Sequence, residues 1–111
     1  MMADAQEQAV PLLMTVVNAG EAWYIIARRT SKADADRTIK ELRDLGIESV
    51  DADWNLAQRA GYFKSKNKMP FADCFAAALA KERAAHLVTG HPEFRQVERE
   101  ISVLWLTTAS R

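Results

Sequence analysis

Four short runs of apolar residues interrupt the chain, and between them apolar residues recur every three or four positions. The run LLMTVV at 12–17 is continuously apolar, which is typical of a strand buried on both faces. Residues 47–52 alternate between apolar and polar side chains well enough to predict a strand. Two more apolar runs lie near the C-terminal end. The pattern therefore predicts strands at 12–17, 47–52, 86–89 and 101–106.

Helical periodicity fills the intervals between the predicted strands. Asn18 is a suitable N-cap, and Glu21 follows it at the spacing of a capping box. Ser31 and Gly46 are suitable start and stop residues for the next helix. The predicted helices are 3–9, 18–29, 31–46, 53–66 and 69–84, with a helical turn at 92–99. The last full helix is apolar nearly all round, so we expect it to be buried, and the alternation of elements predicts an α/β fold with a mostly parallel sheet.

Three polar residues stand where strands end and helices begin, which is where parallel-sheet proteins gather their ligand sites. They are Glu21, Asp73 and His91. Each has a purely structural alternative: Glu21 completes a capping box, Asp73 complements a helix dipole, and His91 is a turn residue or cap. Glu93 follows closely and either adds a carboxylate to the group or only occupies the start of a helix.

Basic side chains lie near these acids in the sequence. Lys64, Lys66 and Lys68 precede the helix that carries Asp73. They form either a phosphate-holding patch beside an acidic site or a favourable group at a helix C-terminus, and Arg28 has the same two interpretations. Cys74 stands in an apolar stretch with no histidine or second cysteine beside it, which favours a buried small side chain over a nucleophile.

Composition narrows the classes of function further. The length of 111 residues predicts one domain over 1–111. Because 15 basic residues balance 15 acidic ones, the net charge gives no indication of a nucleic-acid partner. The longest apolar run, at 9–17, is too short to span a membrane, and the single cysteine suits a reducing compartment. We therefore expect a cytoplasmic protein without a membrane partner. Glycine-rich phosphate loops, HExxH and CxxC motifs are missing from the sequence.

Taken together, VVNAGEAWYIIARR, MPFADCFAAALAKERAAHLVTGHPEF and the final VLWL resemble the PIN domain, in particular VapC-type ribonuclease toxins of bacterial toxin–antitoxin pairs. The resemblance implies a three-layer α/β/α fold and a Mg²⁺- or Mn²⁺-dependent endoribonuclease with a cognate antitoxin as partner. Matched to the family's motif, Glu21 and Asp73 are catalytic acids and metal ligands, and His91 holds a further ligand position. Hard cations prefer such oxygen ligands, and a bound metal activates water for hydrolysis of RNA.

Two features depart from the family's pattern. Its fourth acid is the aspartate of a TGD sequence, and His91 occupies that position here. Its first strand, central in the order 3-2-1-4-5, has no counterpart before Leu12, so we expect the strands at 12–17 and 86–89 each to lack a neighbour. Such exposure predicts a homodimer or higher oligomer. Two hypotheses follow, an endoribonuclease and a catalytically inactive PIN relic that binds an antitoxin or oligomerises.

Overall fold

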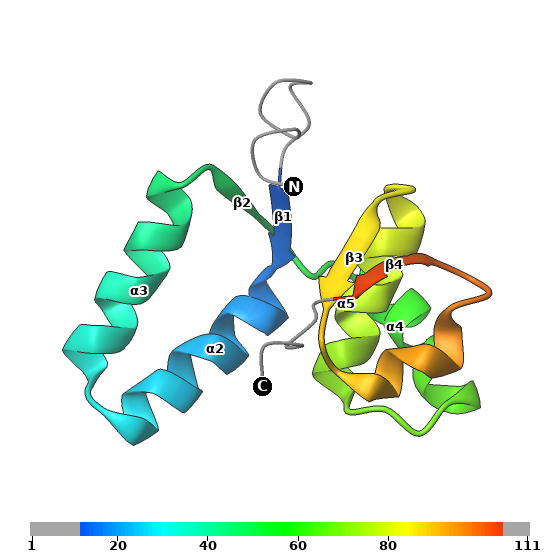
Figure 1. Cartoon of the computed structure of the whole chain (residues 1–111), viewed down its shortest axis with the longest axis horizontal. Helices are drawn as coiled ribbons and strands as arrows, with labels where there is room; N and C mark the ends of the chain where they lie inside the picture. The colour runs from blue at the N-terminus through cyan, green and yellow to red at the C-terminus, as the bar shows by residue number, and fades with distance from the viewer. Residues whose placement is uncertain (1–11, 106–111) are drawn as a thin grey trace. The chain divides into compact units, whose positions relative to one another are not determined.

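The computed structural model describes residues 12–105, which form four strands, four α-helices and one 3₁₀ helix (Figure 1). In chain order they are β1 (Leu12–Thr15), α2 (Val16–Arg29), α3 (Lys32–Asp44), β2 (Ile47–Val50), α4 (Trp54–Lys66), α5 (Phe71–Glu82), β3 (His86–Thr89), η1 (Pro92–Val97) and β4 (Ser102–Trp105). This order confirms the predicted α/β fold. The helix expected at 3–9 and the end of the strand expected at 101–106 lie outside the described residues.

The chain divides after Ala52 into two compact units. In the first unit, β1 and β2 pair in parallel with Leu12 opposite Ile47 and Thr15 opposite Val50. Helices α2 and α3 pack against each other as a hairpin (Figure 1). The strands are parallel because the α2–α3 hairpin connects them as a crossover, which returns the chain to the starting end of the pair.

Helix α2 begins earlier than the sequence predicted. The N-cap is Thr15, whose Oγ1 accepts a hydrogen bond of 3.0 Å from the Asn18 backbone N–H and donates one to Asn18 Oδ1. The predicted cap at Asn18 is therefore wrong, and Val16 and Val17 belong to the helix and not to the strand. Thr15 is the N-cap in place of Asn18 because a threonine in extended backbone directly before the helix satisfies the first free N–H groups. Asn18 then lies inside the first turn.

Helix α3 has the boundaries that its sequence suggested. Ser31 is the N-cap and accepts a hydrogen bond of 3.0 Å from the Asp34 backbone N–H. The chain leaves the helix at Gly46, whose φ of +97° lies in the left-handed region that glycine adopts without a steric penalty. The start at Ser31 and the stop at Gly46 are thus confirmed.

The second unit contains the main core. Helices α4 and α5 pack together, and β3 pairs in parallel with β4 with Leu87 opposite Val103. Its buried apolar side chains come from both helices, from the segment between them and from the region of η1: Leu56, Ala60, Phe63, Met69, Cys74, Phe75, Ala77, Ala78, Leu79, Ala80, Phe94, Val97 and Ile101. Cys74 is fully buried, as its apolar surroundings in the sequence predicted, and burial raises the pKa of its thiol.

Helix α5 is the predicted buried helix, although it spans fewer residues than expected. It ends in a Schellman-type turn, in which the Ala85 N–H donates to the Ala80 carbonyl and the Ala84 N–H donates to the Lys81 carbonyl. Ala84 takes the left-handed position of this turn with φ +50°. That position normally favours glycine, so an alanine there carries some backbone strain.

Within residues 12–105, each strand has a single partner, since β1 pairs with β2 alone and β3 with β4 alone. This agrees with the expectation that the strands at 12–17 and 86–89 each lack one neighbour. The outer face of the second pair carries Val88 opposite Leu104, and both side chains are exposed. None of the helices described in the structure has the length and apolar character needed to cross a membrane.

Candidate metal centre

Asp73 is the buried member of the candidate site. It lies in the first turn of α5, after the N-cap Pro70, and its side chain is only 10% exposed. Burial raises the pKa of the Asp73 carboxyl above its usual 3.8; the neighbouring His91 opposes this rise and Glu93 adds to it. The position in the first turn supports the predicted contact with the helix dipole, and it also leaves the carboxylate facing the loop that follows β3.

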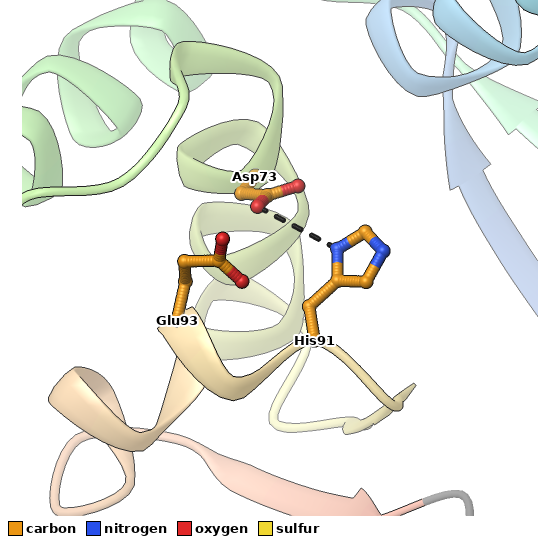
Figure 2. Close-up of side chains that lie close together, drawn as sticks. All are labelled: Asp73, His91 and Glu93. Carbon is orange, nitrogen blue, oxygen red and sulfur yellow. Dashed lines mark ion pairs between the residues drawn. The ribbon is translucent and has the colours of Figure 1, made fainter.

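His91 lies at the end of the loop that follows β3. Its backbone N–H donates a 3.0 Å hydrogen bond to Oγ1 of the buried Thr89, and its ring stacks against Phe94 with centroids 6.3 Å apart. It occupies the N-cap position of η1 without a side-chain capping bond. The imidazole is thus not used as a cap, and Nδ1 lies 3.7 Å from Asp73 Oδ2 (Figure 2). This is too long for a hydrogen bond, so the contact is electrostatic.

Glu93 completes a group of three potential ligands. It comes from the first turn of η1, and its carboxylate points toward the same space as Asp73 and His91 (Figure 2). One ligand atom from each residue lies within 4.8 Å of the others. Of the two interpretations that the sequence allowed for Glu93, the geometry supports an added carboxylate. We call Asp73, His91 and Glu93 the acid–histidine cluster.

Glu21 is placed differently from its expected capping role. Because α2 begins at Val16, Glu21 lies in the second turn and is too far along the helix to complete a capping box. Its carboxylate is half-buried and makes no hydrogen bond or ion pair with a residue in the described range 12–105. Glu21 belongs to the first unit and the cluster to the second, so its role as a second catalytic acid remains a prediction.

Comparison with known proteins assigns the family. The model of the PIN domain family matches residues 2–100, which is most of the chain. The chain belongs to the PIN domain family. No curated protein matches the sequence.

Similar solved structures show a related fold. VapBC from Salmonella typhimurium, bound to DNA, is similar over 93% of this chain and 81% of that chain, with a TM-score of 0.69 and 17% identity. VapBC2 from Rickettsia felis, bound to a promoter DNA fragment, is similar over 86% of this chain and 74% of that chain, with a TM-score of 0.68 and 14% identity. The predicted resemblance to the PIN domain family is therefore confirmed, and the fold is similar to that of these VapBC structures.

The basic residues of this PIN domain differ in how far they are already engaged. Lys64 donates to the Met69 carbonyl at 2.7 Å, and Lys66 donates to the Tyr62 hydroxyl at 2.9 Å, which raises the pKa of Lys66. Arg28 lies over the Tyr24 ring at 5.3 Å. These contacts agree with the structural alternative: Lys66 and Arg28 contact residues of their own helices, and Lys64 bonds the segment that follows α4.

Lys68 is the member of the basic series whose ammonium has no partner within the described part of the chain. Its backbone is held from both sides by Gln96, which accepts from the Lys68 N–H at 2.8 Å and donates to the Lys68 carbonyl at 2.9 Å. These two hydrogen bonds join the segment before α5 to η1. Asp73 lies on α5, and His91 and Glu93 lie at the start of η1. The backbone of Lys68 is thus fixed against η1, and its ammonium group is not engaged by a described residue.

Proposed function

We propose that this PIN domain is a metal-dependent endoribonuclease of toxin–antitoxin type that hydrolyses RNA phosphodiester bonds. The observation that carries the proposal is the acid–histidine cluster, in which a nearly buried carboxylate faces a histidine and a second carboxylate. Nearly buried carboxylates are uncommon without a charge partner, and grouped titratable side chains with a shifted pKa are typical of functional sites.

The two carboxylates of the cluster are suited to hold a divalent cation, for which the family implies Mg²⁺ or Mn²⁺. Asp73 and Glu93 supply carboxylate oxygens, which such ions prefer, and two carboxylates with substrate phosphate are a common Mg²⁺ arrangement. When bound, the ion would acidify a water molecule and neutralise charge on the phosphodiester. Among the residues of the second unit, Lys68 would hold RNA phosphates, and in the first unit we propose Glu21 as a catalytic acid and Arg28 as an RNA-binding residue.

Cleavage of RNA by the purified chain tests this proposal. We expect Asp73→Asn to lower the cleavage rate at least about 100-fold, because removal even of an outer-shell partner of a metal costs 10- to 100-fold. Glu21→Gln should lower it as well. Glu48→Gln, which changes an exposed carboxylate on β2, is the matched control and should retain the original rate. Wild-type cleavage by Asp73→Asn would refute the assignment.

A second candidate function is a catalytically inactive module that binds an antitoxin or another copy of the chain. The exposed pair Val88 and Leu104 on the outer face of β3–β4 favours it, since exposed neighbouring apolar residues mark interaction surfaces. The similar solved structures are VapBC assemblies, which supports an antitoxin as partner.

Mass measurement by light scattering separates the two forms of this second function. A dimer or larger oligomer at micromolar concentration that dissociates when Val88 and Leu104 are both replaced by lysine would support self-association. A monomer that binds an antitoxin encoded beside it would support a heteromeric module. In either case, absence of RNA cleavage with both Mg²⁺ and Mn²⁺ is required for the inactive form.

A further inference from the structure

The donor atoms of the acid–histidine cluster differ from those of an all-oxygen site. Asp73 and Glu93 each offer a carboxylate oxygen, and His91 offers a ring nitrogen. Mg²⁺ is a hard ion that binds oxygen and requires nearly octahedral geometry. Imidazole suits zinc, copper, iron and nickel, and zinc also binds the carboxylates of Asp and Glu. The donor set therefore favours a different class of ion from the one that the family implies.

The spacing of the ligand atoms is compatible with a tetrahedral site. His91 Nδ1 and Asp73 Oδ2 are 3.7 Å apart. Two ligands of a tetrahedral Zn²⁺ ion at 2.0–2.2 Å lie about 3.4 Å from each other. Adjacent ligands of an octahedral Mg²⁺ ion at 2.0–2.1 Å lie about 2.9 Å apart. Opposite ligands of an octahedral ion lie about 4.1 Å apart, so the observed spacing fits a tetrahedral ion but does not by itself exclude an octahedral one, and the preference rests on the donor atoms.

Asp73 supplies an independent indication that the cluster binds a cation. Its side chain is nine-tenths buried, and the ion-pair partner that the described residues give its carboxylate is His91, another member of the cluster, with Nδ1 3.7 Å from Oδ2. A buried carboxylate normally has a hydrogen-bond or charge partner, because removal of the charge from water is costly. The carboxylate is directed at the side chains of His91 and Glu93 (Figure 2), and the second of these is itself acidic. A shared cation would compensate both carboxylates.

His91 is held in an orientation that suits a ligand. The Thr89 hydroxyl fixes its backbone, and the buried Phe94 ring lies nearly parallel to the imidazole, at an interplanar angle of 17°. Nδ1 faces the cluster, while the side chain as a whole is 67% exposed. Three protein ligands with one side open to solvent are the arrangement of catalytic zinc sites, in which water or substrate takes the fourth position.

We propose that the acid–histidine cluster binds Zn²⁺ or a similar imidazole-binding divalent ion in preference to Mg²⁺, with His91 as the residue that sets this selectivity. The inference rests on the proposed function only in placing the metal at the same cluster. It does not require that the chain cleave RNA, because the selectivity follows from three side chains of the second unit.

Calorimetric titration of the full chain, freed of metal beforehand, tests the selectivity. We expect one Zn²⁺ per chain, bound at least about 100-fold more tightly than Mg²⁺, with Mn²⁺ between them. His91→Asp replaces the imidazole by a carboxylate, so Zn²⁺ affinity should fall at least about tenfold and Mg²⁺ affinity should rise. Glu93→Gln should weaken binding of both ions.

The second histidine of the chain is the matched control. His86 lies on β3 with its Nδ1 2.6 Å from Ser102 Oγ, and it is not part of the cluster. His86→Ala should leave Zn²⁺ affinity unchanged, whereas His91→Ala should lower it. If His91→Asp does not fold, as judged by circular dichroism, the Zn²⁺ affinities of His91→Ala and His91→Asn are compared with that of the original chain instead. Visible absorption of bound Co²⁺ reports the geometry, since tetrahedral Co²⁺ absorbs far more strongly than octahedral Co²⁺.

The inference is wrong if Mg²⁺ binds as tightly as Zn²⁺, if His91→Asp and His91→Ala leave Zn²⁺ affinity unchanged, or if His86→Ala lowers it equally. Selective Zn²⁺ binding without RNA cleavage would overturn the proposed nuclease and leave the metal site standing. Cleavage of RNA with Mg²⁺ by a chain that does not bind Zn²⁺ would overturn the proposed Zn²⁺ selectivity and leave the proposed nuclease standing. The two proposals can therefore fail separately.

Discussion

The two units of this PIN domain differ sharply in how they bury apolar side chains. The second unit encloses a core that includes Phe63, Met69 and Val97, each no more than 2% exposed. In the first unit, Ala35 is the one buried apolar side chain among the described residues 12–52. The apolar residues of β1, at 12–14, are each only partly buried. Both units have good helix caps, so local structure alone does not produce a core.

The candidate site lies in the better packed unit. The acid–histidine cluster belongs entirely to the second unit, where α5 is buried on most sides and Phe94 anchors η1. Glu21, the predicted acid of the first unit, lies on a helix with no buried residue. Ligands on a packed scaffold hold their geometry more accurately than ligands on loosely packed elements. We therefore expect the cluster to depend on the core of the second unit.

The largest effect should follow from removal of a core side chain in the second unit. Phe63→Ala should lower the free energy of unfolding by about 3–5 kcal/mol, because it deletes a buried aromatic ring and leaves a cavity. Leu42→Ala in the partly exposed stripe of α3 should cost only about 1 kcal/mol. Urea denaturation followed by circular dichroism measures both. Equal losses would show that the two units are packed alike and would break the comparison.

A smaller effect is expected from the cap of the first unit. Thr15→Ala removes the hydroxyl that accepts from the Asn18 N–H and should lower the stability of α2 by about 1 kcal/mol. Amide hydrogen exchange in α2, compared with that in α5, measures whether the loss is confined to the first unit. Thr15→Ser keeps the hydroxyl and should retain most of the protection. Asn18→Ala, the cap that the sequence suggested, should have the weaker effect.

A gain of stability is expected at the end of α5. Ala84→Gly should raise the free energy of unfolding by up to about 1 kcal/mol, because glycine adopts the left-handed conformation at φ +50° without the steric cost that alanine incurs. Ala85→Gly, next to it and outside the left-handed region, should give no such gain. The urea midpoint of each variant is the measurement. If Ala84→Gly is destabilising, flexibility of the unfolded chain outweighs the strain.

The smallest effect is the pH dependence due to Asp73, measured with EDTA present. Its pKa in the folded protein is raised by burial, so the folded state holds the proton more tightly than the unfolded chain does. The stabilising contribution is therefore complete below pH 3.8 and is lost as pH rises through the raised pKa. Asp73→Asn removes this loss, so its stability relative to the wild type should increase from pH 3 to pH 7. A difference that stays constant with pH would contradict the sign.

Several features were predictable from nearby residues alone. Ser31 and Gly46 delimit α3 as expected, and the apolar stretch 74–80 forms the buried part of α5. Such features depend on side-chain to backbone hydrogen bonds and on periodicity, which act over a few residues. The predicted cap at Asn18 failed for a local reason too, since Thr15 lies in extended backbone and competes successfully for the same N–H groups.

The sequence by itself determined the order of elements, the parallel α/β class, the membership of the PIN family and the residue types of the candidate site. Only the tertiary structure decided that Asp73 is buried and that His91 and Glu93 share its surroundings. It also decided that Lys64 binds the Met69 carbonyl and so is engaged in the fold. Spacing along the chain could not supply these facts, because burial and the meeting of α5 with η1 depend on how distant segments pack.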